Sequence, residues 1–374
     1  MKKRARELGL EFYGETGRYN AITDVEGVEV GYSTIIKGAP EDYKGMGSAF
    51  ARTGVTAILP RGRQRSVVYA GRHDLNGNGE LTGTHWMDDS GFIHGPIMIT
   101  NTNSVGIVRD STTKWMLENK FYHPLVFQGR EIEGSGYFYP VVGETYDGLL
   151  NDTNGFHVKE EHVREALETA HGGAIAEGNV GGGTGMVCHE FKGGTGTASR
   201  KLDEKDGGYT VGVLVQANHG ARKWFTIGGV PLGEAITGVD PVYRSIVPKP
   251  GTGSIIVVLA TDAPVNPIQL SKMCKRVPIG IGRLGSGYEN GSGDIFVAFS
   301  TANENSFTHT TSSAKILGDF MMDPIYKAVA DAVEEAILNA LCAAETMEGM
   351  DYNKIYAMPQ EQVVEILKKH GKIK

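Results

Sequence analysis

Two continuous runs of apolar residues predict strands that are buried on both faces. Residues 254–261 read Ser-Ile-Ile-Val-Val-Leu-Ala-Thr, and residues 294–300 read Asp-Ile-Phe-Val-Ala-Phe-Ser. An uninterrupted β-branched and aromatic run is typical of a strand that is covered on both sides. Shorter alternating or β-rich segments predict four further strands, at residues 25–32, 53–59, 96–101 and 209–217.

Apolar residues spaced three and four apart predict helices. The longest predicted helix spans residues 323–345, and its apolar stripe consists of Ile325, Ala328, Val329, Ala332, Val333, Ala336, Ile337 and Leu341. Asn266 followed by Pro267 is typical of another helix start, because Asn caps and Pro fits the first turn. Three shorter helices are predicted at residues 110–118, 159–170 and 359–370.

Strands and helices are mixed without regular alternation, and no linker rich in Pro, Ser or charge divides them. The pattern predicts one α+β domain over residues 1–374, in which helices cover stacked sheets. The glycine content is unusually high, because 52 of 374 residues are Gly, about twice the average share. This excess predicts many tight turns and close backbone approaches.

Charge and hydropathy exclude several classes of partner. The formal net charge is −7, whereas a surface that binds nucleic acid or anionic lipid concentrates positive charge. No run of 18 apolar residues occurs, so we expect no membrane-spanning segment. The basic residues at the N-terminus are not followed by an apolar stretch, and we expect a cytoplasmic protein.

Familiar site motifs are mostly incomplete. Residues 74–80 resemble the start of an EF-hand loop, but position 12 of that loop is His85 instead of Glu, so a turn is the preferred interpretation. The glycine cluster at 181–185 lacks the remaining residues of a phosphate-binding loop. The three cysteines form no zinc spacing, and no Gly-x-Ser-x-Gly elbow joins a strand to a helix. We therefore predict neither a metal nor another cofactor.

The Gly253-Ser254 step at the head of an apolar strand allows a specific chemistry. If the peptide bond before Ser254 is cut, the serine gains an α-amine with a pKa of about 7.7–8.0. Such an amine can act as the base for its own hydroxyl, so that no histidine is needed. Glycine before the serine favours the cut because it permits a strained backbone.

Six ordered blocks of sequence resemble the L-aminopeptidase D-amidase/D-esterase family, which includes the β-peptidyl aminopeptidases. The blocks are residues 76–83, 100–106, 142–148, 215–220, 253–264 and 291–296. The resemblance implies a four-layer αββα sandwich like that of N-terminal-nucleophile hydrolases, with different connectivity, and a homotetramer. It also implies self-cleavage between Gly253 and Ser254 into an α chain, 1–253, and a β chain, 254–374.

The same resemblance assigns roles to six residues. Ser254 would be the nucleophile, and its α-amine the general base. Ser292 and Asp294 would bind that amine, while Asn218 would donate to the oxyanion. Glu144 would pair with the free ammonium of the substrate, and Tyr146 would line the same pocket. Family members carry Glu where this chain has Asp294, so we expect a looser or water-bridged contact there.

The sequence thus predicts a self-processing serine aminopeptidase or amidase. Its expected partners are small peptides, amides or esters with a free N-terminal amine. One alternative is an acyl transferase of the ornithine acetyltransferase type, a related fold that has threonine at the nucleophile position. A calcium-binding module built on Asp74–Glu80 is a third hypothesis from a different class.

Overall fold

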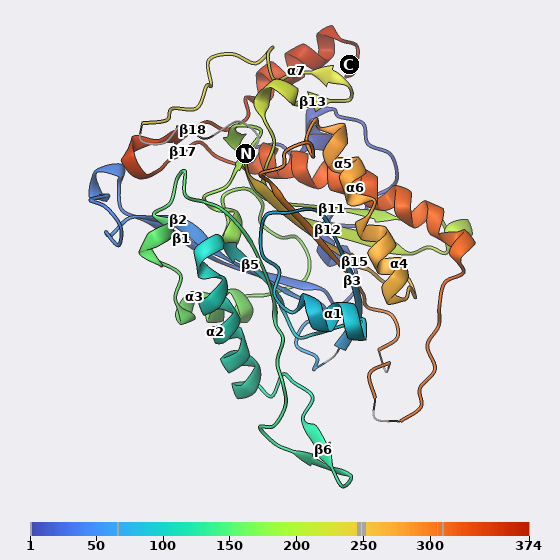
Figure 1. Cartoon of the computed structure of the whole chain (residues 1–374). Coiled ribbons are helices and arrows are strands. Elements are labelled where there is room, and N and C mark those ends of the chain that lie inside the picture. Colours follow the sequence, from blue (N-terminus) through green and yellow to red (C-terminus); the bar gives the residue numbers. More distant parts are fainter. Residues whose placement is uncertain are drawn as a thin grey trace.

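The computed structural model describes residues 2–65, 67–244, 248, 252–304, 306–308 and 310–373. Two β-sheets lie face to face between two layers of helices (Figure 1). The predicted αββα order is therefore confirmed.

The first sheet has six strands in the order β11-β12-β15-β16-β3-β4. Their bounds are β3 Val67–Gly77, β4 Phe92–His94, β11 Gly194–Lys201, β12 Thr210–Asn218, β15 Ser254–Thr261 and β16 Gly293–Ser300. The second sheet has four strands, in the order β1 (Glu29–Lys37), β2 (Ala51–Leu59), β5 (Ile97–Asn101) and β8 (Val141–Thr145). Within these two sheets, the pairs β15–β16 and β5–β8 are parallel, and the other described pairs are antiparallel.

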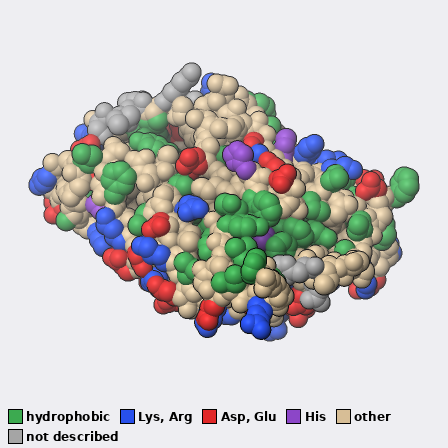
Figure 2. All heavy atoms as spheres, turned by 60° about the horizontal axis from the view of Figure 1, so that its bottom comes forward, with side chains coloured by type: hydrophobic (Ala, Val, Ile, Leu, Met, Phe, Trp, Pro, Cys, Tyr) green, Lys and Arg blue, Asp and Glu red, His purple; other side chains and the backbone are tan. Residues whose placement is uncertain are grey.

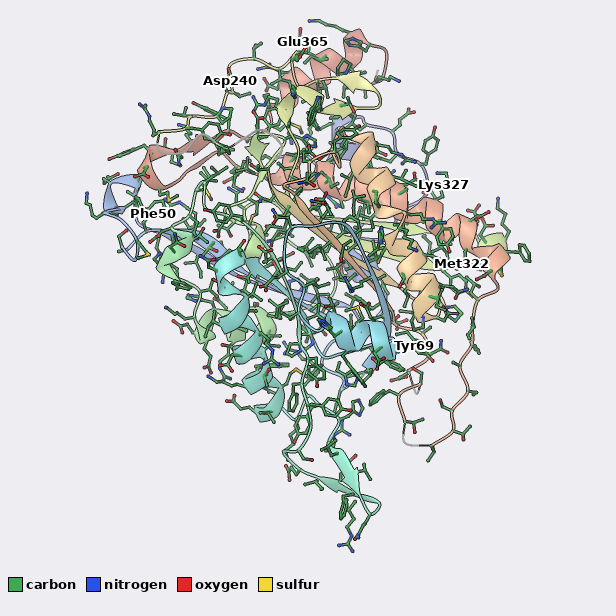
Figure 3. All side chains as sticks on the ribbon, in the orientation of Figure 1. Phe50, Tyr69, Asp240, Met322, Lys327 and Glu365 are labelled. Atoms are coloured by element: carbon green, nitrogen blue, oxygen red, sulfur yellow. The ribbon has the colours of Figure 1, made fainter. Side chains whose placement is uncertain are left out.

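Helices cover the outer face of each sheet. The six-stranded sheet packs against α4 (Pro267–Cys274) and α6 (Met322–Ala343), and α5 (Val277–Arg283) packs on α6. Figure 3 labels Met322 and Lys327 on α6 and Tyr69 on β3. The four-stranded sheet is covered by α2 (Val105–Glu118) and α3 (Glu160–Glu168). Two further helices are α1 (Thr84–Ser90) and α7 (Gln360–Lys369).

Strand alternation explains how three apolar layers form. On β15, Ile255, Val257 and Leu259 join the cluster under α4–α6, whereas Ile256, Val258 and Ala260 join the cluster between the sheets. Successive side chains of a strand point to opposite faces, so a continuous apolar run fills both layers at once. A third apolar cluster lies between the four-stranded sheet and α2–α3.

Four two-stranded ribbons complete the described strands. They are β6 (Leu125–Phe127) with β7 (Arg130–Ile132), β9 (Val187–Cys188) with β10 (Phe191–Lys192), β13 (Thr226–Ile227) with β14 (Val230–Pro231), and β17 (Met347–Glu348) with β18 (Lys354–Ile355). The β6–β7 ribbon projects away from the layers (Figure 1). Figure 2 brings that side of the molecule forward and shows apolar side chains gathered on it.

Some predicted elements are displaced. The strand expected at residues 25–32 begins at Glu29 and continues to Lys37, and α2 begins at Val105 instead of residue 110. The turn expected at Asp74–Glu80 is wrong for its first half, because β3 continues to Gly77. The glycines at 194 and 196 lie in a buried strand, β11, that the sequence did not predict.

Candidate active site

Three neighbouring strands of the larger sheet end around Ser254. Ser254 is the first residue of β15, and it lies opposite Asn218, the last residue of β12, and Gly293, the first residue of β16. Ser254 is buried. Strand alternation puts its side chain on the same face as Ile256, toward the second sheet. The register alone therefore brings together three of the predicted segments.

The peptide bond before Ser254 is held on both sides. The N–H of Gly293 donates to the carbonyl oxygen of Gly253 over 3.1 Å. A Cβ atom at Gly253 would lie 2.2 Å from the carbonyl oxygen of Asn218, so only glycine fits this close approach. The carbonyl that self-cleavage would attack is thus already a hydrogen-bond acceptor.

Ser292 and Asp294 form a buried pair beside this peptide. The Ser292 hydroxyl donates to Oδ1 of Asp294 over 2.6 Å. Burial raises the pKa of Asp294 to about 6, and the bond from Ser292 opposes that rise. The expectation that the shorter Asp side chain makes a looser or water-bridged contact is wrong for Ser292, because the two side chains are directly hydrogen-bonded.

The amide of Asn218 is held at both ends. Its Nδ2 donates to the carbonyl oxygen of Tyr146 over 3.0 Å, and its Oδ1 accepts the N–H of Val187 over 2.8 Å. These two bonds orient the amide and identify which end carries the nitrogen. Nδ2 has two hydrogens, so the bond to Tyr146 accounts for one of them.

Glu144 is a buried carboxylate on β8, in the opposing sheet. Its Oε1 accepts the N–H of Glu80 over 3.0 Å, and its Oε2 accepts the hydroxyl of Thr102. Burial raises the pKa of Glu144 above its ordinary value, and both hydrogen bonds oppose the rise.

The turn at Gly79 connects Glu144 to the first sheet. A Cβ atom at Gly79 would lie 2.9 Å from Oε1 of Glu144 and 3.7 Å from the Cα atom of Gly293. Glu144 therefore lies near the start of β16, and hence near the Ser292–Asp294 pair. Tyr146 contributes its carbonyl to Asn218, and the residue as a whole is 52% exposed.

The structure adds partners that sequence reasoning missed. Thr102 and the backbone N–H of Glu80 hold Glu144, and the N–H of Val187 holds Asn218. Thr102 lies inside one of the matched sequence blocks, which is the only signal that could have singled it out. A backbone N–H carries no such signal, because every residue except proline has one.

The segment considered for calcium has a different role. Asp74 pairs with Arg72 at 2.6 Å, while the side-chain amides of Asn76 and Asn78 donate to the carbonyls of Asn290 and Gly291. These amides present hydrogens to the loop before Ser292, whereas a calcium ion needs oxygen ligands. The segment therefore frames the loop that carries Ser292.

Solved structures identify the class of protein. The L-aminopeptidase D-Ala-esterase/amidase of Ochrobactrum anthropi, described as a prototype of the serine aminopeptidases and a variant of the Ntn-hydrolase fold, superposes with a TM-score of 0.89. It is 46% identical, and the match covers 100% of both chains. A β-aminopeptidase from a Burkholderia species is 42% identical, with a TM-score of 0.85 and 99% coverage of both chains. The fold is this variant of the Ntn-hydrolase fold, and the protein is a hydrolase.

Sequence comparison identifies the family. The chain matches Peptidase family S58 over residues 20–355. The β-peptidyl aminopeptidase BapA of Sphingosinicella microcystinivorans is 48% identical over 382 residues, which cover 99% of this chain and 93% of that protein. The chain belongs to peptidase family S58 and is a serine aminopeptidase. The acyl transferase alternative receives no support from these relatives.

Among the described residues, no helix combines the length and the apolar character that crossing a membrane requires.

Proposed function

We propose that the chain cuts itself between Gly253 and Ser254 and then uses Ser254 to release N-terminal residues from small peptides, amides or esters. The observation that carries this proposal is the strand register, in which Ser254 lies between Asn218 and Gly293. The names of the relatives support substrates with a free N-terminal amine, since they are aminopeptidases.

Apart from water, self-cleavage needs only groups at this edge of the sheet. The Ser254 hydroxyl attacks the Gly253 carbonyl, whose oxygen accepts the Gly293 N–H. The hydroxyl proton passes to the amide nitrogen, the C–N bond breaks, and an ester forms between Gly253 and the Ser254 oxygen. Water then hydrolyses the ester, which leaves a carboxylate on Gly253 and a free amine and hydroxyl on Ser254.

The freed amine then serves as the base for substrate hydrolysis. It accepts the Ser254 hydroxyl proton while the oxygen attacks the substrate carbonyl. The developing oxyanion accepts the second Nδ2 hydrogen of Asn218, a kind of contact worth about 10²–10³ in rate. The protonated amine returns its proton to the leaving group, and water releases the acyl group in the same way.

The remaining residues act on charged amines. Ser292 and Asp294 accept hydrogen bonds from the Ser254 amine and orient it. The amine becomes cationic during each cycle. Glu144 binds the ammonium group of the substrate, because a buried carboxylate is a strong partner for a cation. Tyr146 lines the same pocket and holds Asn218 through its carbonyl.

The direct test is Ser254→Ala, examined on a denaturing gel and with an aminoacyl anilide as substrate. We expect one uncut band and no hydrolysis, whereas the unchanged protein shows two bands. Ser111→Ala is the matched control, because Ser111 is also buried and its hydroxyl has no hydrogen-bond partner among the described residues. A Ser254→Ala protein that still turns over substrate would exclude the proposal.

The homotetramer and the cytoplasmic location remain predictions from the sequence. The division of residues 1–374 into segments 1–253 and 254–374 is likewise part of this proposal. Sequencing the N-termini of the purified protein tests the division.

A further inference from the structure

A second cluster of reactive side chains involves the residue after Asn218 and the β9–β10 hairpin, which hydrogen-bonds Asn218. It consists of Cys188 and His189, at the turn between β9 and β10, and His219, which follows the last residue of β12. All three are buried, and one ligand atom from each lies within 4.8 Å of the other two. The sequence does not reveal this cluster, because Cys188 and His189 are adjacent whereas His219 lies 30 residues after His189, and this spacing matches no zinc motif.

The distances suit a small, soft divalent cation. Sγ of Cys188 lies 3.8 Å from Nδ1 of His219. With zinc–sulfur bonds of about 2.3 Å and zinc–nitrogen bonds of about 2.0–2.1 Å, tetrahedral coordination separates such a pair by about 3.6 Å. The two imidazole rings lie with their centroids 5.4 Å apart at an interplanar angle of 64°.

His189 has a buried ring nitrogen, Nε2, that forms no hydrogen bond with any described residue. His219 presents its Nδ1 atom to Sγ of Cys188, and Nε2 on the other side of the ring is buried and has no hydrogen-bond partner among the described residues. The other nitrogen of His189, Nδ1, lies 3.5 Å from the carbonyl oxygen of Ala221. A metal-bound histidine usually donates its second ring N–H to such a carbonyl, which leaves the lone pair of the first nitrogen for the ion.

The backbone conformation at His189 is also unusual, and it supports the same interpretation. His189 and Glu190 both have positive φ, at 49° and 59°, in the two-residue turn of the β9–β10 hairpin. Turns of this kind favour Asn and Gly because other residues are strained there. Strain of this sort persists where it positions a functional group, and here it brings the His189 imidazole beside His219.

We propose that Cys188, His189 and His219 form a buried site for a zinc ion. These side chains would supply three of the four ligands of a tetrahedral zinc ion, and the ion would have a structural role outside the hydrolytic steps. It joins the β9–β10 hairpin to the end of β12, and these two elements supply Val187 and Asn218, which hydrogen-bond each other. The proposal concerns metal binding and holds whether or not Ser254 is the nucleophile.

The test measures zinc in the full-length protein produced in zinc-supplemented medium. We expect about one zinc per chain in the unchanged protein and in Cys274→Ala, and less than a tenth of that in Cys188→Ala. Cys274 is the matched control because it is also a buried free cysteine, but it lies on α4. Equal zinc contents in the unchanged protein and Cys188→Ala would overturn the proposal.

A second measurement does not depend on the folding of a variant. The unchanged protein, produced with cobalt in place of zinc, should show the intense visible bands of tetrahedral cobalt and a near-ultraviolet thiolate-to-cobalt band. Absence of both bands would also overturn the proposal.

Discussion

Burial of Asp294 makes the uncut chain sensitive to pH. The pKa of this residue rises from an ordinary 3.8 to about 6, so the folded chain binds its proton more tightly than the unfolded chain does. The contribution of Asp294 to the free energy of unfolding is therefore fully present below pH 3.8 and is lost as the pH rises through about 6. The difference amounts to about 3 kcal/mol for a rise of this size.

Urea unfolding of Ser254→Ala at pH 5 and pH 8 measures the part of this effect that is lost between these two pH values, about half of it, in a chain that stays uncut. We expect Asp294→Asn, added to that background, to remove most of the loss of stability that Asp294 causes between the two pH values. An unchanged pH difference would show that Asp294 is not the group concerned. If the chain is cut as proposed, the new ammonium at Ser254, which lies one residue along in the strand register, would offset this cost.

Glu144→Gln should weaken substrate binding and leave self-cleavage intact. The amide keeps the shape but loses the charge that pairs with an ammonium, and a charged hydrogen bond contributes about 1.5–3 kcal/mol. We expect kcat/KM for an aminoacyl anilide to fall about 10- to 100-fold. Glu80→Gln is the control, since the Glu80 side chain is exposed and only its backbone N–H hydrogen-bonds Glu144, although its charge also raises the pKa of Glu144. An unchanged kcat/KM, with both bands present on the gel, would refute this role.

Residue type predicts part of the site and no more. A Gly-Ser step before an apolar strand has a chemical meaning that can be read directly, but the roles of Asn218 and Glu144 came from the family resemblance. The contacts of Val187 and Thr102 depend on which strands become neighbours. That information lies in long-range pairing, which a local pattern does not contain.

At the level of elements, close packing of α6 on β11 depends on Gly196. A Cβ atom there would lie 2.0 Å from the carbonyl oxygen of Ala336, so the helix would have to move. We expect Gly196→Ala to lower the free energy of unfolding by at least about 2 kcal/mol, as overpacking does. Gly106→Ala is the matched control, because Gly106 lies in α2 with open space around it and alanine favours helix.

Urea unfolding of both glycine variants measures the change in the free energy of unfolding that each substitution causes. Equal stabilities for Gly196→Ala and Gly106→Ala would contradict the packing argument. The same contact explains why the sequence did not predict β11. Its glycines leave room for the close approach of α6, whereas the sequence pattern of a strand is recognised by β-branched and aromatic residues.

Elements buried on both faces were the easiest to predict. Residues 254–261 form β15 as predicted, and α6 begins and ends within two residues of the bounds predicted for that helix. The apolar residues of these elements fill layers that the rest of the chain must cover. β3 was missed because its second half is polar, from Arg72 to Gly77, and only its partners show that it is a strand.

On the scale of the whole molecule, the β6–β7 ribbon bears on the predicted homotetramer. Its apolar side chains are exposed, with Phe127 at 65% and Ile132 at 47%. An isolated two-stranded ribbon gains little stability by itself, and exposed apolar groups of this kind favour association. We expect light scattering after size exclusion to give four copies for the unchanged protein and a smaller assembly when Phe127 and Ile132 are both changed to Ser.

Ile268→Ser is the control, since Ile268 is 69% exposed but lies on α4. A monomeric unchanged protein would contradict the predicted tetramer. An unchanged assembly in the double variant would contradict the role of the ribbon. The overall α+β class followed from the mixed pattern of strands and helices, whereas the four-layer order came from the family resemblance.

The most direct measurement is N-terminal sequencing of the purified, active protein. Cleavage before the nucleophile predicts two sequences, of which the second begins Ser-Ile-Ile-Val at Ser254. The Ser254→Ala protein should show only the first. Fully active protein that carries one N-terminus, with the bond between Gly253 and Ser254 intact, would contradict the account.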